Sequence, residues 1–214
     1  MDASGQRRLV VATTNQGKLA EFRRLLPAEI ELLTLSDLSL TQAAETGLTF
    51  EANARTKAIH AASASGLHAI ADDSGLEVDA LDGAPGVFSA RFTGENADEQ
   101  QNRVGLLAAL RDVPLRQRSA RFRCVVALAA PDGSVTTATG TCDGAIAFEP
   151  VGDHGFGYDP VFLLPDGRTM AQLPRDVKDC ISHRARAYRA MLPRLRAAFG
   201  LNQPEEGSKI PWLN

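Results

Sequence analysis

The sequence predicts an α/β domain built around a mixed sheet, and three observations support this. Short apolar runs alternate with segments of helical periodicity in the N-terminal third of the chain. Two strand-like segments come later, joined by the turn Pro131-Asp132-Gly133, which is typical of a β-hairpin. The chain has 214 residues, of which 44% are hydrophobic and 23% charged, so it can bury a substantial core. Alternation followed by a hairpin favours a sheet with both parallel and antiparallel strands.

The first elements are a strand, a helix and a second strand. Residues 9–13 are mostly apolar and typical of a buried strand. Residues 17–26 have apolar side chains at helical spacing and stop at Pro27, which cannot continue a helix. Residues 30–33 predict a second short strand. A longer helix follows from Thr49, its expected cap, to about residue 65. Three of its side chains share one face: Phe50, Asn53 and Lys57.

The apolar run 68–71 predicts a buried strand that ends in the acidic turn Asp72-Asp73-Ser74-Gly75. Neighbouring carboxylates repel each other, and a divalent cation is one compensator. In a regular strand the two acids would point to opposite faces, so only one of them is expected to act at the phosphate. We expect this to be Asp73, which is nearer the turn. A plain Asx or Ser turn is the structural alternative.

Three further elements complete the expected fold. Residues 96–111 predict a helix capped by Asn96. Its core candidates are Val104, Leu106, Leu107 and Leu110. The hairpin strands are expected at 119–130 and 134–142, and residues 182–199 predict a final helix with an Arg-rich outer face.

Composition excludes several classes of function. The net charge of -3 argues against a general nucleic-acid coat or an anionic membrane surface as a partner. Three distant cysteines without a zinc-ligand spacing indicate reduced thiols in a cytoplasmic protein. The apolar run near the N-terminus, residues 9–12, is too short for a signal peptide or a membrane span.

The segment Thr13-Thr14-Asn15-Gln16-Gly17-Lys18 lies between the first strand and the first helix. A loop there aims backbone N–H groups and a helix N-terminus at an anion, and the lysine adds a charge, which suits a triphosphate. It is not a P-loop, because Ala12 stands where that motif has Gly and Leu19 where it has Ser or Thr. A capped helix start with a solvent-exposed lysine is the alternative.

Acids for a magnesium ion come from two segments. Mg²⁺ typically takes one or two protein carboxylates together with phosphate oxygens and waters. Asp73 and Glu45 can provide them, with Asp72 as a third candidate ligand. For Glu45 alone, the alternative is a solvated loop acid.

Two segments can recognise a base. Gly155-Phe156-Gly157-Tyr158-Asp159-Pro160 combines glycines, which allow close backbone approach, with aromatic rings for stacking and a carboxylate. Lys178 and Ser182-His183-Arg184 offer donors near a helix start, with Ser182 as its cap. An aromatic turn and a basic surface patch are the respective structural alternatives.

Together these motifs describe a nucleotide site, and their order resembles a known family. The chain carries Thr-x-Asn-x-Gly-Lys, Glu-Thr-Gly-x-Thr-Phe-Glu-x-Asn-Ala, Ala-Asp-Asp-Ser-Gly-Leu, Gly-Phe-Gly-Tyr-Asp-Pro-x-Phe and Ser-His-Arg. From about residue 9 to 199 it is similar to the noncanonical purine nucleoside triphosphate pyrophosphatases, the inosine triphosphatases of the Ham1 type.

The resemblance implies an elongated two-lobed fold, with a long mixed central sheet flanked by helices and an active-site cleft between the lobes. Residues 9–199 would form this single domain, 1–8 a flexible N-terminus and 200–214 a loosely ordered tail. The resemblance also implies a homodimer that hydrolyses dITP, ITP and XTP to the monophosphate and pyrophosphate with Mg²⁺, which cleanses the nucleotide pool.

The resemblance also implies roles position by position. Asp73 matches a proton acceptor and metal ligand, Glu45 a metal-linked acid, and Lys57 and Lys18 lysines that approach the phosphates. The residues implied to bind substrate are Thr13, Thr14, Asn15, Gln16, Gly17, Lys18, Ser74, Phe156, Gly157, Tyr158, Asp159, Lys178, His183 and Arg184.

The resulting hypothesis is attack of water on the α-phosphorus, with Asp73 as base and Mg²⁺ on the phosphates. His183 or Arg184 would donate to the 6-oxo group of the purine, which adenine lacks. Two alternatives stay open: a pyrophosphatase of different base preference, for example for pyrimidine triphosphates, and a non-catalytic nucleotide sensor.

Overall fold

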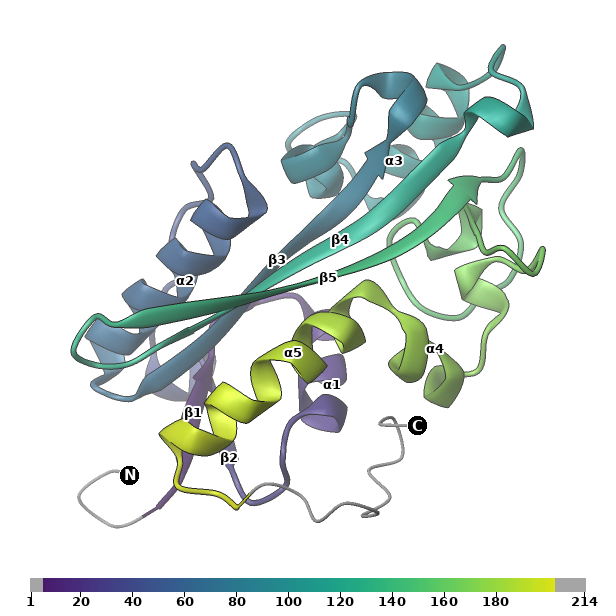
Figure 1. The fold of residues 1–214 in the computed structure, drawn as a ribbon. Coiled ribbons are helices and arrows are strands. Elements are labelled where there is room, and N and C mark those ends of the chain that lie inside the picture. The colour runs from purple at the N-terminus through teal and green to yellow at the C-terminus, as the bar shows by residue number, and fades with distance from the viewer. Residues whose placement is uncertain (1–5, 203–214) are drawn as a thin grey trace. The chain divides into compact units, whose positions relative to one another are not determined.

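A computed structural model describes residues 6–202 and contains a six-stranded sheet (Figure 1). The strand order is β2-β1-β3-β4-β5-β6. The strands are β1 (Arg8–Val11), β2 (Glu31–Thr34), β3 (His68–Val78), β4 (Ser119–Ala129), β5 (Val135–Ile146) and β6 (Phe162–Leu163). β1 pairs in parallel with β2 and β3, whereas β5 pairs antiparallel with β6. The predicted mixed sheet is therefore confirmed.

Helices connect and flank these strands. The α-helices are α1 (Gln16–Leu25), α2 (Phe50–Ser65), α3 (Glu99–Ala109), α4 (Arg175–Ile181) and α5 (His183–Ala198). Short 3-10 helices lie at Ser36–Leu38, Asp79–Leu81, Gly86–Arg91, Leu115–Gln117, Asp159–Val161 and Met170–Gln172. Within residues 6–202, no helix combines the length and the apolarity needed to cross a lipid bilayer.

The chain divides into two compact units, which are described separately. Among the described residues, the first unit comprises 6–73, 124–140 and 184–202, and the second unit comprises 74–123 and 141–183. β3, β4 and β5 each contribute residues to both units.

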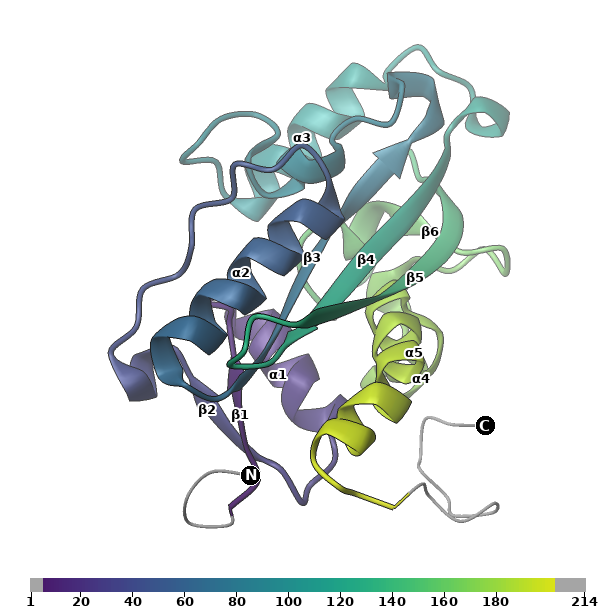
Figure 2. The same cartoon turned by 60° about the vertical axis from the view of Figure 1, so that its left-hand side comes forward.

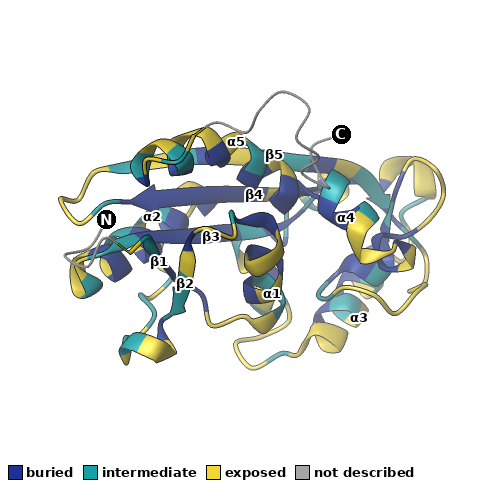
Figure 3. Ribbon diagram, turned by 90° about the horizontal axis from the view of Figure 1, so that it is seen from below, coloured by how far each residue is buried: buried dark blue, intermediate teal, exposed yellow. Residues whose placement is uncertain are grey.

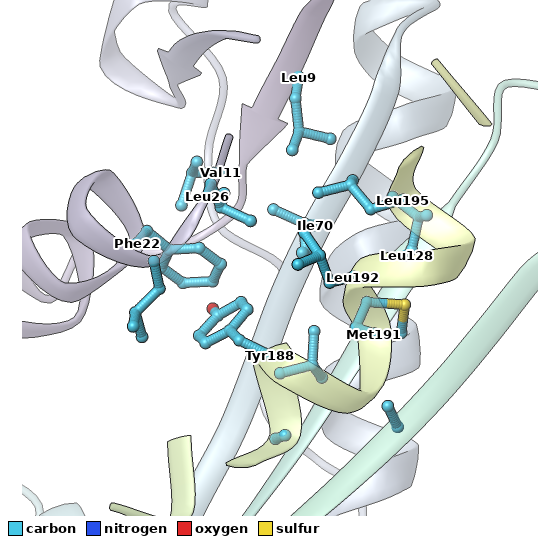
Figure 4. Close-up of a cluster of buried hydrophobic side chains, with 14 of the residues drawn as sticks. Leu9, Val11, Phe22, Leu26, Ile70, Leu128, Tyr188, Met191, Leu192 and Leu195 are labelled. Atoms are coloured by element: carbon cyan, nitrogen blue, oxygen red, sulfur yellow. The ribbon is translucent and has the colours of Figure 1, made fainter. Parts of the chain in front are cut away.

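The core of the first unit lies between the sheet and two helices (Figure 4). Ile70 of β3 packs with residues of β1, α1 and α5, and the rings of Phe22 and Tyr188 meet edge to face with centroids 4.6 Å apart. α1 and α5 lie on this side of β3, and α2 lies on the opposite side (Figures 1 and 2). The two faces of β3 in this unit therefore meet different helices.

The second unit has its own core, which α3 and the far ends of β3, β4 and β5 share. Its buried members include Leu76, Leu106, Phe122 and Ile146. β3 and β4 are buried along most of their length, while the loops around them are exposed (Figure 3).

Side-chain caps begin two helices, and the one predicted for α2 is confirmed. The Asn15 side chain accepts from Lys18 N at 2.9 Å at the start of α1. Thr49 caps α2 by accepting from Ala52 N at 3.1 Å, and Gly66 ends α2 in the left-handed region.

The prediction that the strand ends at residue 71 in an acidic turn is wrong. β3 continues for 11 residues through Asp72, Asp73, Ser74 and Gly75 to Val78. The strand tolerates two consecutive acids because cations from different helices meet them on its two faces, as shown below.

The predicted cap and core of α3 also need correction. The cap is Asp98 rather than Asn96, in a reciprocal capping box with Gln101, so the helix begins at Glu99. Leu106 and Leu110 are buried as predicted and Leu107 packs partly against the same core, but Val104 is 60% exposed.

The last two predicted elements differ in their bounds. β5 runs four residues past the predicted end at residue 142, to Ile146, and its last residues pair with β6. The expected final helix begins at His183, and Ser182 is an extended residue that separates it from α4. α4 was not predicted from the sequence.

Candidate functional site

The predicted anion loop of the first unit lies directly before α1. Thr13 is buried and its hydroxyl accepts from Asn15 N at 3.2 Å, while Thr14, Asn15 and Gln16 are exposed. The partial positive charge of a helix N-terminus therefore reaches solvent beside Lys18. This placement agrees with the predicted loop between β1 and α1.

A buried ion network lies beneath this loop. The carboxylate of Asp72 contacts Lys18 Nζ at 3.2 Å and Arg184 Nε at 3.0 Å, and the Arg184 guanidinium also pairs with Glu21. Asp72 is 1% exposed, and Cys124 lies against the same oxygen at 3.7 Å. Burial alone would raise the pKa of Asp72, but the charges of Lys18 and Arg184 hold it well below its usual range.

A second group lies on the other face of β3, toward α2. Lys57 Nζ donates to Glu45 Oε1 at 2.8 Å and to Asp73 Oδ1 at 3.2 Å. Asn53 donates to Asp73 Oδ2 at 3.0 Å and accepts from Gly47 N at 2.8 Å. Asp72 and Asp73 thus contact residues on opposite sides of the strand, as the alternation of a strand requires.

The charges of this second group are not balanced. Burial raises the pKa of Asp73 and the charge of Glu45 raises it further, although Lys57 and Lys18 oppose the shift. Burial would lower the pKa of Lys57, but the surrounding carboxylates outweigh it and raise that pKa. Asp73 is therefore a carboxylate in a dry site with one adjacent ammonium group shared with a second acid.

The residues of this group fit a magnesium ion that also binds phosphate. Glu45 and Asp73 converge on one point, the ammonium of Lys57, and carboxylate oxygens are the ligands Mg²⁺ prefers. Across residues 6–202, no cluster of three or more His, Cys, Asp or Glu side chains is placed to hold a metal. A magnesium ion here would therefore need oxygens from a ligand or from water.

Gln42, which was not predicted as a site residue, links the anion loop to the second group. Its Oε1 accepts from Thr14 N at 3.1 Å and from Thr14 Oγ1 at 2.9 Å, and its Nε2 donates to Glu45 Oε1 at 3.4 Å. Glu21 and Asn53 were also missed as site residues. Both side chains are buried and so need partners, but this burial is known only from the structure.

The second unit contains the predicted base-recognition loop. Asp159 Oδ2 accepts from Phe156 N at 2.9 Å and from Lys178 Nζ at 2.6 Å, and Lys178 lies 4.8 Å from the centroid of the Phe156 ring. Gly155 has φ +79, and an added Cβ would lie 2.0 Å from Asp159 Oδ2. Glycine is therefore required at this position for Asp159 to approach the backbone so closely.

The two aromatic residues of this loop have different surroundings. Phe156 is partly exposed and can offer a ring face, whereas Tyr158 is buried in the second core and donates its hydroxyl to Ser89 O at 2.9 Å. Tyr158 therefore supports the loop rather than presenting an open stacking surface.

The remaining residues predicted to bind substrate belong to different units. His183 is buried in the second unit, where its ring stacks on Phe122 with centroids 4.7 Å apart. Arg184 belongs to the first unit, where it pairs with Asp72 and Glu21. Ser74 is a partly buried residue of β3 in the second unit.

Comparisons with known proteins agree with this arrangement. The sequence profile of the Ham1 family matches residues 9–194. A dITP/XTP pyrophosphatase of Shigella flexneri is 49% identical over 193 residues, which cover 88% of this chain and 98% of that protein. A dITP/XTP pyrophosphatase of Geobacter sulfurreducens is 50% identical over 183 residues, covering 84% and 92% of the two chains.

Solved structures give the same result. A HAM1 protein from Coxiella burnetii superposes with a TM-score of 0.82 at 42% identity, covering 89% of this chain and 98% of that one. The Staphylococcus aureus Ham1 protein has a TM-score of 0.80 at 40% identity, covering 89% and 99%. With the fold, the motifs and the matched length in agreement, the chain belongs to the Ham1 family.

Proposed function

We propose that this protein hydrolyses noncanonical purine nucleoside triphosphates, namely dITP, ITP and XTP, to the monophosphate and pyrophosphate. Relatives at about half sequence identity carry the name dITP/XTP pyrophosphatase. The observation that carries the proposal is the buried Lys57, held between Asp73 and Glu45 on one face of β3. A carboxylate pair sharing a single ammonium suits phosphate chemistry, which needs both a base and a place for cations.

The first unit supplies the groups for the triphosphate. Residues 13–18 would bind phosphate oxygens through backbone N–H groups at the start of α1, with Lys18 adding positive charge. Glu45 and Asp73 would hold Mg²⁺ together with phosphate oxygens, and Asp72, already paired with two cations, would keep Lys18 in place. When bound, Mg²⁺ supplies charge neutralisation on the phosphates.

Asp73 is the proposed general base. The water that attacks the α-phosphorus gives a proton to the Asp73 carboxylate, the new P–O bond forms, and the bond to the pyrophosphate group breaks. A pKa raised by burial makes the carboxylate a better proton acceptor. Asn53 and Lys57 fix its orientation, and Lys57 and Lys18 stabilise negative charge on the phosphates.

The second unit supplies the groups for the purine. Phe156 would stack on the base, and Lys178 and His183 would provide donors to its 6-oxo group. Arg184, expected to read the base, is engaged by two carboxylates, so its contribution to base recognition stays a prediction. The homodimer implied by the resemblance and the cytoplasmic location inferred from the cysteines also stay predictions.

The first experiment is product analysis with dITP, XTP, GTP, ATP and dTTP, with and without Mg²⁺. We expect magnesium-dependent pyrophosphate from dITP and XTP and little from the other three. Orthophosphate would contradict attack at the α-phosphorus, turnover of dTTP would favour the pyrimidine alternative, and binding without turnover would favour a sensor.

A variant tests the role of Asp73. Asp73→Asn should retain nucleotide binding but lower kcat by about 10²–10⁴-fold, the usual contribution of a general base. Unchanged turnover would contradict this assignment.

A further inference from the structure

Both backbone polar groups of Gly157 are bonded to side chains of α3. Gly157 N donates to Glu99 Oε2 at 2.8 Å, and Gly157 O accepts from Arg103 at 2.7 Å. Glu99 and Arg103 are one helical turn apart and 3.8 Å from each other. This charged pair therefore binds both the backbone N–H and the backbone carbonyl of one residue in the Gly155–Asp159 loop.

The helix that carries this pair is itself firmly placed. The capping box of Asp98 and Gln101 defines the start of α3, so Glu99 is its first residue. Buried Asn102 accepts from Thr93 N at 3.0 Å and donates to Ala90 O at 3.0 Å. The N-terminal turn of α3 is therefore a fixed support rather than a free helix end.

Gly157 is the residue of the loop where such a support acts most directly. Its φ of +60 turns the chain between Phe156 and Tyr158. Tyr158 donates its hydroxyl to Ser89 O and Phe156 N donates to Asp159, while the two bonds to α3 fix the peptide groups that join Gly157 to Phe156 and to Tyr158. Without the α3 pair, both peptide groups of Gly157 lose a hydrogen bond, and glycine allows them to reorient within the turn that Asp159 N closes on Phe156 O.

We infer that Glu99 and Arg103 are positioning residues for base recognition: they fix the Gly157 backbone and thereby the ring face of Phe156. This rests on the proposed function, because it assumes that Phe156 meets the base. Neither residue needs to contact the substrate. Both bonds are charge-assisted, so losing them changes the conformation of the loop and, through the loop, the binding of the base.

The test compares Glu99→Ala and Arg103→Ala with two controls, Glu95→Ala and Arg111→Ala. Glu95 is 82% exposed and pairs only on the surface with Arg91, and Arg111 is exposed beyond the end of α3. Glu99→Gln and Arg103→Lys serve as conservative variants, since each retains one hydrogen bond to Gly157. The readouts are KM and kcat for dITP, inhibition by pyrophosphate, and hydrogen exchange of the peptide covering 155–161.

We expect KM for dITP to rise about five- to tenfold in the two alanine variants, with kcat within about twofold of wild type. Exchange of the 155–161 peptide should quicken, and the conservative variants should restore part of both effects. Inhibition by pyrophosphate, which has no base, should not change. The controls should match the wild-type protein in every readout.

Other results have distinct meanings. If KM and exchange match the controls, or if pyrophosphate inhibition weakens in step with KM, the positioning role is overturned. If the wild-type protein releases no pyrophosphate from dITP, the proposed function is wrong, and the positioning role that depends on it is wrong as well. That failure is recognised in the wild type alone, without reference to any variant.

Discussion

The neighbouring acids of β3 should respond in opposite directions to the same isosteric substitution. Asp72 is buried between Lys18 and Arg184, and their charges hold its pKa well below the usual range. Burial instead raises the pKa of Asp73. Asp72→Asn therefore removes a stabilising charge, whereas Asp73→Asn removes a charge that the folded state disfavours.

The change in unfolding free energy depends on how well the remaining charges are compensated after each substitution. Breaking a buried ion pair by removing one partner costs about 3–5 kcal/mol. Arg184 retains Glu21, and Lys18 is 15% exposed and can rehydrate, so Asp72→Asn should cost about 2–4 kcal/mol of unfolding free energy. Asp73→Asn should change the free energy of unfolding by between zero and about 1 kcal/mol in the stabilising direction.

Urea unfolding followed by circular dichroism measures both variants, at pH 7 and again below pH 4. Because the pKa of Asp72 is lowered by folding, its stabilisation is complete above its unfolded pKa of about 3.9 and is lost as the pH falls below that value. The deficit of Asp72→Asn should therefore shrink below about pH 4. Equal losses in the two variants at pH 7, or a deficit that is constant with pH, would refute the reasoning.

Three other substitutions test separate features. Arg118, 2% exposed, donates to Leu110 O, Val113 O and Ala147 O at 2.6–2.9 Å, so Arg118→Met should cost about 3 kcal/mol in urea unfolding, and Arg118→Lys less. Gly155→Ala should lower the free energy of unfolding more than Gly133→Ala, because both glycines have positive φ but only the added Cβ at Gly155 would collide with another side chain, that of Asp159. KM for dITP should rise in Gly155→Ala alone. Lys57→Met leaves two carboxylates facing each other, so it should lose about 2–3 kcal/mol at pH 7 and recover part of this loss below pH 4, as measured by urea unfolding.

The elements that sequence reasoning located correctly carry their own local signals. Pro27 marks the end of α1, and α2 has the cap Thr49 at one end and the terminator Gly66 at the other. These signals act over four residues or fewer, so no tertiary information is needed to read them. The hairpin turn at residues 131–133 is a signal of the same kind.

The extent of β3 depends on residues far along the chain. A run of Asp-Asp-Ser-Gly predicts a turn because isolated acids do not belong in a buried strand. The partner Arg184 is 112 residues away from Asp72 in sequence, and Lys57 is 16 residues away from Asp73. Only the fold brings these cations to the strand, so the sequence pattern alone favoured the wrong local structure.

The charge balance on each face of β3 explains why one face is structural and the other is suited to a ligand. On the α1 and α5 side, the acids Asp72 and Glu21 pair with the cations Lys18 and Arg184, and these four groups together carry no net charge. On the α2 side, Asp73 and Glu45 both pair with Lys57, and these three groups together carry one negative charge. Burial raises the pKa of Asp73, whereas the charges of Lys18 and Arg184 outweigh burial at Asp72 and lower its pKa. An added divalent cation would offset this negative charge, so the α2 face is where we propose the magnesium site, with Asp73 and Glu45 as its proposed ligands.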